Sequence, residues 1–182
     1  MNTRHEFIAE SLADVQSRIA KAAHDSKRSL EEITLIAVTK TYPASDVAIL
    51  HELGVRNFGE NRTEEGSEKS LAVPGTWHYQ GQVQSRKIRE IASWADLIHS
   101  LDEVSHIEKL ARICEETGKQ IGVFIQLSLD GAPDRGGVLE EKLATLADSV
   151  TSSKSLELKG LMCVPPVEYE HDRAFSEIAQ IH

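Results

Sequence analysis

The chain is predicted to adopt an α/β fold built on a parallel sheet. Short apolar segments that suit strands alternate with segments that suit helices, and this pair occurs six times after a leading helix. Five of the expected strands begin near residues 33, 55, 76, 96 and 121, at intervals of 20 to 25 residues. This spacing is typical of parallel strands that are joined by right-handed helical crossovers. A length of 182 residues suits a single domain.

The leading helix is predicted from a capping signal and an apolar face. Thr3 and Glu6 have the spacing of a capping box. The apolar residues that follow recur every three or four positions and would share one face: Ile8, Leu12, Val15 and Ile19. After a polar turn, residues 33–38 (ITLIAV) form a nearly continuous apolar run, which predicts a strand covered on both faces.

The remaining segments continue the alternation. The expected helices span residues 45–53, 61–70, 85–94, 102–117, 138–152 and 170–182. The expected strands span residues 55–59, 77–81, 96–101, 121–127 and 156–164. Gly54 and Gly118 are placed to end two of the helices. Residues 130–137 (DGAPDRGG) lack the phosphate-loop pattern and read as a turn-rich connection between a strand and a helix.

The composition disfavours several classes of protein. There are 20 Lys and Arg residues against 29 Asp and Glu, so the formal net charge is −9 and neither nucleic acid nor an anionic membrane is an expected partner. Apolar runs stay far below the ~20 residues of a membrane-spanning helix, and the first residues lack the apolar core of a signal peptide. Cys114 and Cys163 share no motif, so we expect reduced thiols in a soluble, cytoplasmic protein.

Two architectures fit this alternation, an open doubly wound sheet and a (β/α)₈ barrel. No G-x-G-x-x-G motif follows the first expected strand, which disfavours a dinucleotide-binding sheet. Polar residues follow several expected strands at their carboxyl ends, where barrels place their chemistry: Lys40, Glu60, Asn61, Gln84 and Ser128. Six units do not close an eight-stranded barrel, so the residues alone leave both architectures open.

Lys40 is the residue that most clearly suggests chemistry. It follows the apolar run of residues 33–38, and Pro43 then turns the chain. At the mouth of a barrel its ammonium group would be partly desolvated, which disfavours the charged form and lowers the pKa of the amine. A neutral amine can attack a carbonyl carbon and form a Schiff base. The alternative is a lysine that extends from a strand end into water.

Residues 58–61 (FGEN) form a second candidate cluster. Gly59 would permit an unusual backbone angle. Asn61 has two interpretations, a hydrogen-bond donor to a ligand oxygen or, more commonly, the cap of the following helix. Glu60 would either pair with a cation on a neighbouring strand or begin a solvated helix.

Two further segments have a structural and a functional interpretation. Trp77 and Tyr79 alternate along an expected strand, as packing residues do. His78 between them is expected in the interior or at an interface rather than as a metal ligand, because no second ligand has suitable spacing. Met162 would either join the core, its more common role, or lie against a flat ligand ring. No Ser-His-Asp order, H-E-x-x-H motif or pair of catalytic carboxylates is evident, so no catalytic residue is assigned.

Five segments occur in an order that resembles the pyridoxal phosphate homeostasis proteins of the YggS/PROSC type: LIAVTKTYP, RNFGEN, WHYQGQVQSRK, IHSLD and GLMCVPP. The similarity extends from the first helix to about Phe175. The resemblance implies a TIM-type (β/α)₈ barrel like that of alanine racemase, of fold type III, which holds pyridoxal 5′-phosphate (PLP). It thereby favours the barrel over the open sheet.

The resemblance also implies roles for three residues. Lys40 matches the lysine that holds PLP as a Schiff base, Asn61 matches a residue near the pyridine ring, and Met162 matches a residue in the strand beside it. The implied function is vitamin B6 homeostasis, in which the protein carries or regulates PLP without an established turnover reaction. The implied partners are PLP, other B6 vitamers and PLP-dependent apo-enzymes.

Two alternatives remain beside this interpretation. A PLP-dependent racemase or lyase on the same barrel needs a general acid–base partner near Lys40, and none is evident in the sequence. Racemases of this fold also carry a C-terminal β domain with a catalytic tyrosine, which we do not expect here. The other alternative is an interaction module whose cofactor site has decayed.

The sequence departs from the family pattern in three places. Residues 126–128 (QLS) stand for Gln-x-Asn, and residues 135–137 (RGG) stand for a lysine followed by glycine. Family members continue beyond the position of His182 with two more strands, which supply most contacts to the phosphate. We therefore expect residues 1–182 to form one PLP-binding domain without the last two βα units. We favour a sequence that is part of a longer protein over a fragment that binds the cofactor weakly.

Overall fold

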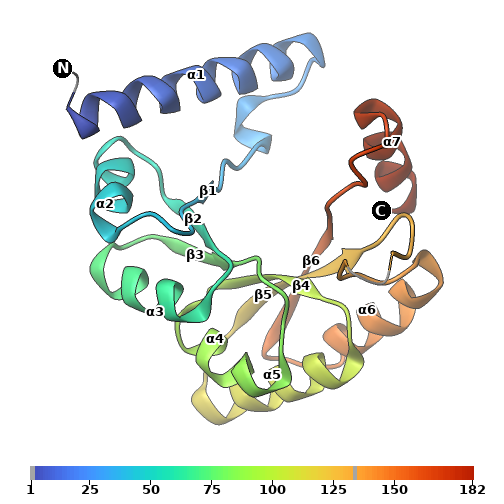
Figure 1. Cartoon of the computed structure of the whole chain (residues 1–182). Coiled ribbons are helices and arrows are strands. Elements are labelled where there is room, and N and C mark those ends of the chain that lie inside the picture. Colours follow the sequence, from blue (N-terminus) through green and yellow to red (C-terminus); the bar gives the residue numbers. More distant parts are fainter. Residues whose placement is uncertain (1–2, 133–134) are drawn as a thin grey trace.

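A computed structural model describes residues 3–132 and 135–182 of the chain (Figure 1). Its centre is a six-stranded sheet in which each strand pairs in parallel with the next strand along the sequence. The strands are β1 (Ala37–Val38), β2 (Asn57–Glu60), β3 (Thr76–Tyr79), β4 (Leu97–Leu101), β5 (Ile121–Leu127) and β6 (Leu156–Cys163). The prediction of an α/β fold with a parallel sheet is confirmed.

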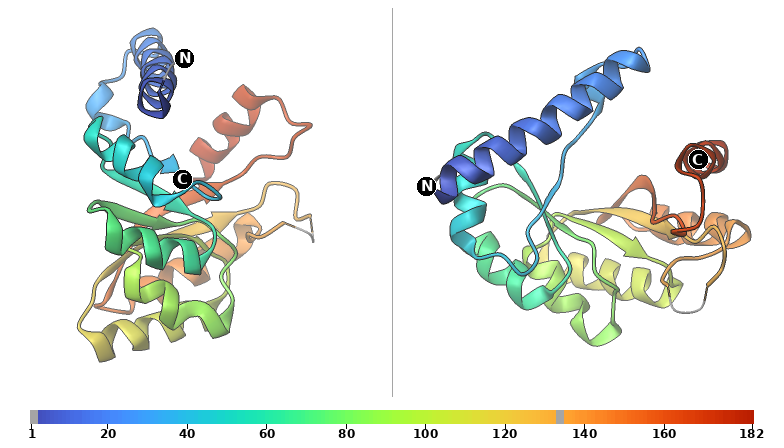
Figure 2. Two further views of the ribbon diagram at one scale, coloured as in Figure 1. Left: turned by 60° about the vertical axis from the view of Figure 1, so that its left-hand side comes forward. Right: turned by 45° about the horizontal axis from the view of Figure 1, so that its top comes forward.

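Helices connect consecutive strands and cover the outer side of the curved sheet. The α-helices are α1 (Arg4–Asp25), α2 (Ala44–Glu52), α3 (Thr63–Ala72), α4 (Ile88–Trp94), α5 (Val104–Thr117), α6 (Leu143–Thr151) and α7 (His171–Ile181). Short 3₁₀ helices span Leu30–Glu32, Ser85–Lys87 and Glu140–Lys142. Figures 1 and 2 show α2 to α6 in sequence along the outside, whereas α1 and α7 lie near the β1 and β6 edges.

The hydrophobic core lies between the outer face of the sheet and these helices. Successive side chains of a strand point to opposite faces, and β5 follows this rule throughout its length. Its buried residues alternate with half-buried ones, and the buried set is Ile121, Val123, Ile125 and Leu127. The residues between them, which include Phe124 and Gln126, face the inner side of the sheet.

Aromatic rings form the part of the core beneath α3 and α4. The ring centroids of Phe58 and Trp77 are 5.2 Å apart. Trp94 meets Trp77 and Tyr79 edge to face, with centroid distances of 6.5 and 6.0 Å. The expectation that Trp77 and Tyr79 are packing residues is confirmed. Gly66 of α3 leaves the space that the Trp94 ring occupies, because a Cβ at this position would overlap that ring.

Several local signals act as the sequence predicts. Thr3 and Glu6 form the reciprocal capping box at the start of α1. Gly118 ends α5 in the left-handed conformation, with φ of 68°. Gly54 follows α2 with φ of 97°, which other residues rarely adopt. The strand expected over residues 121–127 has those bounds as β5.

The strand expected over residues 33–38 is wrong in length and in burial. Only Ala37 and Val38 pair with a neighbour, and their partners on β2 are Phe58 and Gly59. In this register Ile36 would lie opposite Asn57, where β2 begins, so residues 33–35 extend past the start of β2 and have no β2 residue beside them. Val38 is 44% exposed, so this strand is not covered on both faces.

The sheet keeps two free edges in the described part of the chain. β1 pairs with β2 alone and β6 pairs with β5 alone, so these six strands do not close into a ring. The helices expected over residues 85–94 and 138–152 each begin with a 3₁₀ turn before α4 and α6. The larger barrel thus stays a prediction.

Cys114 and Cys163 are free thiols, as expected. Cys114 is buried and Cys163 is half-buried, and this burial raises the pKa of both thiols. Thiols of this kind are poor nucleophiles because little thiolate forms. Within residues 3–132 and 135–182, none of the helices has the length and apolar character needed to cross a membrane.

Replacement of Gly66 tests the aromatic packing beneath α3. Alanine is normally favoured over glycine in a helix by about 1 kcal/mol, but here the added methyl group would overlap the Trp94 ring. That ring is held by a 3.1 Å hydrogen bond from its Nε1 to Thr63 Oγ1. We expect Gly66→Ala to lower the free energy of unfolding by about 1–3 kcal/mol in urea denaturation. Ser67→Ala, the next position of the helix, is the control and should not lower it.

Candidate functional site

Lys40 lies in a turn two residues beyond the end of β1. Its side chain is exposed and makes no hydrogen bond or ion pair with any residue that the structure describes. The expected desolvation of its ammonium group is therefore wrong. The physical reason is that β1 has a strand neighbour on one side only, so its carboxyl end is open to water.

Asn61 follows β2, the strand that pairs with β1. Val38 pairs with Gly59, so the segments that contain Lys40 and Asn61 leave adjacent strands at the same end of the sheet. The interpretation of Asn61 as a helix cap is wrong, because α3 begins at Thr63 and its cap position is Arg62. Asn61 is half-buried, and its side-chain amide has no hydrogen-bond partner within the described ranges. The amide is therefore available to a ligand.

Gly59 provides space rather than an unusual backbone angle. Its φ is not positive, so the expectation of a special conformation is wrong. A Cβ at this position would lie 3.0 Å from Gln80 Oε1 and 3.2 Å from the Cγ2 atoms of Ile36 and Val38. These three side chains approach one another on the inner side of the sheet only because residue 59 has no side chain.

Four residues near Lys40 in the sequence and the sheet form a hydrogen-bonded set that we call the Lys69 network: Thr39, Glu60 and Lys69, which are buried, and Glu65, which is half-buried. Lys69 Nζ donates to Glu60 Oε1 at 2.7 Å, to Thr39 O at 2.8 Å and to Glu65 Oε2 at 3.1 Å. Thr39 Oγ1 donates to Glu60 Oε1 at 2.6 Å. Glu60 is 0% exposed and Lys69 is 4% exposed, so water does not screen their attraction.

The Lys69 network corrects the expectation for Glu60. The carboxylate does pair with a cation, but the cation comes from helix α3 and not from a neighbouring strand. Glu65 also accepts a hydrogen bond from Thr41 N at 2.8 Å. This backbone donor, followed by Lys69, lowers the pKa of the Glu65 carboxyl group below its ordinary value. Thr41 itself has φ of 69°, a left-handed conformation that is unfavourable for a β-branched residue.

Met162 lies near the end of β6, at the other edge of the sheet from Lys40. It pairs in register with Gln126 of β5 and is half-buried. It does not belong to the buried hydrophobic core, so its core interpretation is not supported. Lys40 and Asn61 thus follow adjacent strands at the β1 side of the sheet, whereas Met162 lies on β6 at the opposite edge.

A chain of polar side chains crosses the inner face of the sheet. His78 Nε2 lies 3.0 Å from Asn57 Oδ1, and His78 Nδ1 lies 2.8 Å from His99 Nε2. The His99 ring stacks on Phe124, with centroids 4.3 Å apart. Asn57 Oδ1 can only accept, so His78 Nε2 donates to it, and His78 Nδ1 accepts from His99 Nε2. The expectation of an interior His78 is confirmed.

Both histidines of this chain are held neutral. Burial lowers the pKa of His78 to about 4, and burial together with His78 lowers the pKa of His99 to about 4. A proton added to His78 Nδ1 would place two N–H groups on the short hydrogen bond between the rings. The pair therefore has a structural role at neutral pH, and neither ring is positioned as a proton donor there.

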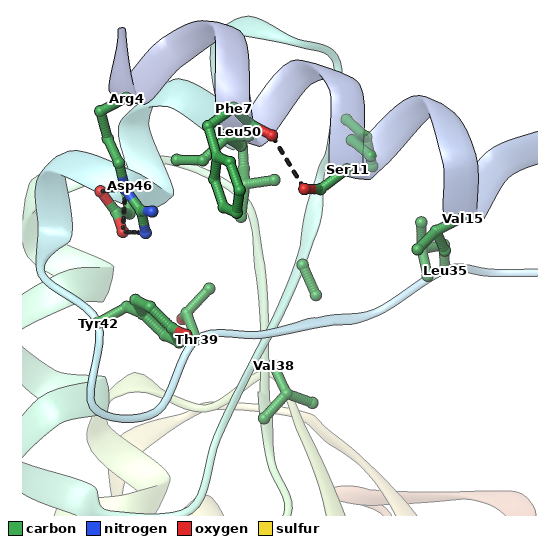
Figure 3. Close-up of a pocket in the computed structure, with 13 residues that line it drawn as sticks. Arg4, Phe7, Ser11, Val15, Leu35, Val38, Thr39, Tyr42, Asp46 and Leu50 are labelled. Carbon is green, nitrogen blue, oxygen red and sulfur yellow. Dashed lines mark hydrogen bonds and ion pairs between the residues drawn. The ribbon is translucent and has the colours of Figure 1, made fainter. Parts of the chain in front are cut away.

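A groove of about 300 Å³ runs between α1 and the segment that leads into Lys40 (Figure 3). Its lining is mainly apolar and includes Phe7, Val15, Leu35, Val38 and Tyr42. Arg4 closes one end by pairing with Asp46 of α2, and its guanidinium lies over the Phe7 and Tyr42 rings at 5.5 and 5.6 Å. The Arg4 guanidinium lowers the pKa of Asp46. Because Asn61 and Met162 do not line it, we do not assign this groove as the cofactor site.

The region after β4 and β5 is held by hydrogen bonds within the protein. Asp102 Oδ2 accepts from Gly137 N at 3.0 Å, and Ser128 Oγ accepts from Gly131 N at 3.0 Å. Residues 133–134 of the turn-rich segment lie outside the described residues. Asp102, Glu103 and His106 offer ligand atoms within 4.8 Å of one another. Glu103 is exposed and Asp102 is already an acceptor, so no metal is assigned there.

The sequence alone did not indicate Lys69, Glu65 or His99 as residues of the site. Glu65 and Lys69 have the i,i+4 spacing of an ion pair, but such pairs are usually exposed, and the polar segment around Lys69 gave no sign of its burial. His99 had a usable signal, because it lies 21 residues after His78 on the next expected strand. His78 pairs in register with Leu97, and His99 lies two residues after Leu97, so both histidines lie on the same face of the sheet.

The two neutral histidines predict how stability depends on pH. In the unfolded chain they titrate near pH 6.5, whereas in the folded chain they titrate at about 4. The unfolded state binds more protons between these values, so the free energy of unfolding should fall as pH falls from about 6.5 towards 4, by up to ~1.4 kcal/mol per pH unit for each histidine. Urea denaturation at several pH values measures this slope.

Matched variants separate the buried histidines from other groups. His99→Gln removes one titrating ring but keeps an N–H donor, and it should reduce the slope. His5→Gln, at an exposed position of α1, should leave it unchanged. An equal slope in His99→Gln and in the original chain would show that His99 is not neutral in the folded state.

Comparisons with known proteins agree with this fold. The model of the family "Alanine racemase, N-terminal domain" matches residues 12–182. The pyridoxal phosphate homeostasis protein of Corynebacterium glutamicum is 38% identical over 175 residues, which cover 92% of this chain and 79% of that protein. The Escherichia coli protein of the same name is 37% identical over 180 residues, with 96% and 77% covered.

Solved structures agree as well. PipY of Synechococcus elongatus with PLP bound matches with a TM-score of 0.80 and 29% identity, over 96% of this chain and 79% of that chain. An alanine racemase of Clostridium difficile matches with a TM-score of 0.67 at 14% identity, over 83% of this chain and 43% of that chain, which is a likeness of fold alone. The order of motifs around Lys40 and these matches together lead to one conclusion: the chain belongs to the pyridoxal phosphate homeostasis protein family, with the fold of the alanine racemase N-terminal domain.

Proposed function

We propose that this chain binds PLP as a Schiff base on Lys40 and acts in vitamin B6 homeostasis as a carrier or regulator of PLP. The observation that carries the proposal is the state of Lys40. Its amine is exposed and uncommitted, while the peptide groups on both sides of it are held by the Lys69 network. The names of the relatives and the PLP bound in PipY support the same cofactor.

The residues at the edge of the sheet fit such a cofactor. Lys40 supplies an accessible amine, and Asn61 supplies an amide without a protein partner in the described part of the chain. Gly81 follows β3 at the same edge, and a Cβ there would overlap the backbone oxygen of Asn61. The backbone after β2 and the backbone after β3 therefore lie close together.

We assign a role to each of the three residues. PLP supplies an aldehyde that condenses with an amine and releases water. Lys40 provides this amine, Asn61 donates a hydrogen bond from its amide to a polar atom of the ligand, and Met162 offers a polarisable apolar surface to the ring. Gln126, which pairs in register with Met162, donates to Gly136 O at 3.0 Å and so is fixed beside it.

The structure favours a carrier over a turnover enzyme. General acid–base catalysis needs a titratable group within reach of the reacting atoms. Glu60, which directly precedes Asn61, has a carboxylate, but this group is fully buried and bound to Lys69 and Thr39. His78 and His99 are neutral and occupied by each other and by Asn57. Of the titratable groups described here, none contacts Lys40.

We further propose that the sheet is part of an eight-stranded TIM-type barrel and that residues 1–182 belong to one PLP-binding domain. The free edges at β1 and β6 and the exposed apolar side chain of Val38 support this architecture. We also propose a cytoplasmic location, which the two free thiols support. Other B6 vitamers and PLP-dependent apo-enzymes are the partners that a PLP carrier would meet.

The Schiff base is tested by mass spectrometry after incubation with PLP and reduction with borohydride. We expect one reduced pyridoxyl phosphate group per chain, bound to Lys40. Lys40→Ala and Lys40→Arg should abolish this adduct, because neither offers a neutral primary amine. Lys154→Ala removes an exposed lysine far along the sequence and should leave the adduct unchanged.

The outcomes of this experiment differ for each interpretation. An adduct that survives in Lys40→Ala would overturn the assignment of Lys40. No specific adduct on the protein from its complete gene would favour the decayed site. Net turnover of an amino acid by the loaded protein would favour a racemase or lyase.

Amide hydrogen exchange tests the barrel. Thr39 N donates to Gly59 O of β2 at 3.0 Å, and because successive amides of a strand point to opposite sides, Val38 N faces the free edge. In the protein expressed from its complete gene, we expect the Val38 amide to be protected by a further strand. Exchange at the rate of an unstructured chain would contradict closure at this edge.

A further inference from the structure

The buried ammonium group of Lys69 is coordinated entirely by the protein. Its three N–H donors reach Glu60 Oε1, Thr39 O and Glu65 Oε2, at 2.7, 2.8 and 3.1 Å. An ammonium group has three donors and no acceptor, so Lys69 has none left for a ligand. Its side chain is 5% exposed, and it cannot replace Lys40 as the amine that meets a ligand from water.

The same network holds the backbone on both sides of Lys40. Thr39 O belongs to the peptide group that precedes Lys40, and it accepts from Lys69 Nζ. Thr41 N belongs to the peptide group that follows Lys40, and it donates to Glu65 Oε2 at 2.8 Å. Each peptide group is planar, so fixing both planes fixes the backbone angles of Lys40 and hence the direction in which its side chain leaves.

The conformation of Thr41 indicates that this restraint is needed. Its φ of 69° is left-handed, which a β-branched residue adopts only when its surroundings impose it. The hydrogen bond to Glu65 is the contact that holds the Thr41 amide in this orientation. This hydrogen bond acts together with the turn hydrogen bond from Tyr42 N to Thr39 O at 3.1 Å to hold the backbone that carries Lys40.

Burial makes the network depend on each of its charges. Glu60 is 0% exposed, and its Oε2 has no hydrogen-bond partner among the described residues. Lys69 and the Thr39 hydroxyl are thus the groups that compensate its charge, both at Oε1. Loss of the Lys69 ammonium would leave a buried carboxylate without a counter-charge, and Thr39 would lose its anchor.

We propose that Lys69 is a positioning residue, which acts through Glu65, Glu60 and the peptide groups of Thr39 and Thr41 to direct the Lys40 amine toward PLP. This inference rests on the proposed function of Lys40. It assigns to Lys69 no contact with the ligand. In the condensation the neutral Lys40 amine would form a C=N bond with the aldehyde carbon, and its two hydrogens would leave with the aldehyde oxygen as water.

The test compares two neighbouring glutamates of α3. Glu65→Ala removes the acceptor of the Thr41 amide, and its partly exposed position allows the chain to fold. Glu64→Ala is the matched control, because Glu64 pairs instead with Lys87 and its side chain is 66% exposed. Lys69→Met removes the buried ammonium while keeping an unbranched apolar stem. Urea denaturation without PLP gives the folded fraction of each variant.

Three readouts follow the orientation of Lys40. The affinity for PLP should fall about tenfold or more in Glu65→Ala and Lys69→Met, because a small displacement of a reacting group has a large effect. The circular dichroism induced in the PLP absorption band, per bound PLP, should fall in the same two variants. The Thr41 amide, measured without PLP, should exchange at least about tenfold faster in Glu65→Ala. Glu64→Ala should match the original chain in all three.

The outcomes separate this inference from the proposed function. If the original chain forms the Lys40 adduct and folded Glu65→Ala binds PLP with unchanged affinity and dichroism, Lys69 does not position Lys40. Equal losses in Glu64→Ala and Glu65→Ala would also overturn the inference, since they would reflect general destabilisation of α3. If the original chain forms no adduct that depends on Lys40, the proposed function fails and the inference fails with it. Should Lys69→Met not fold, the two glutamate variants decide the matter.

Discussion

The carboxylate of Glu60 and the ammonium group of Lys69 have almost no access to water, and they join three elements of the structure. Glu60 ends β2, Lys69 lies in α3, and Thr39, which contacts both, follows β1. Taking two charges out of water is costly, and their attraction compensates only when their hydrogen bonds are satisfied. Loss of one partner from such a buried pair typically costs about 3–5 kcal/mol. Since β1 has only two paired residues, its position depends more on this pair than on the sheet ladder.

The two faces of the sheet carry different kinds of side chain. The outer face carries the rings and aliphatic chains that bind the helices, such as Phe58, Trp77 and Ile98. The inner face carries polar groups that satisfy one another, with the chain from Asn57 through His78 to His99 as the clearest case. A neutral histidine pair needs no counter-charge, so it adds polarity to the interior without the cost of a buried ion. The chemistry is thereby left to the carboxyl edge, where Lys40 is open to water.

Periodicity predicted the elements that have partners on both sides. The alternation in residues 121–127 gave the bounds of β5, which lies between β4 and β6. It failed for residues 33–38, where apolar composition was correct but pairing was limited by the start of β2. The length of a strand depends on how far the adjacent strand extends. The sequence of the segment itself does not encode where that adjacent strand begins. Asn61 shows the same limit, because its side chain has the chemistry of a cap while the helix begins two residues later.

The candidate site likewise contains residues that the sequence indicates and residues that it does not. Lys40 could be singled out from the sequence as a candidate residue because it follows an apolar segment. The motifs that come after it support the same choice. Lys69 was not predictable, because a lysine in a polar helix is normally solvated, and only the fold shows that α3 turns it inward towards Glu60.

Under the proposed function, the contrast between Lys40 and Lys69 explains how one of two amines in the same corner of the fold becomes the reactive one. Both belong to the same corner of the fold, yet Lys69 is buried and uses every donor, whereas Lys40 is exposed and uses none with the described residues. A carrier that must capture and release an aldehyde needs an amine that water and ligand can reach. It also needs that amine to start from a fixed point, because a free side chain loses rotational freedom on binding. The buried lysine provides the fixed point and the exposed lysine provides the access, so the two requirements are met by different residues.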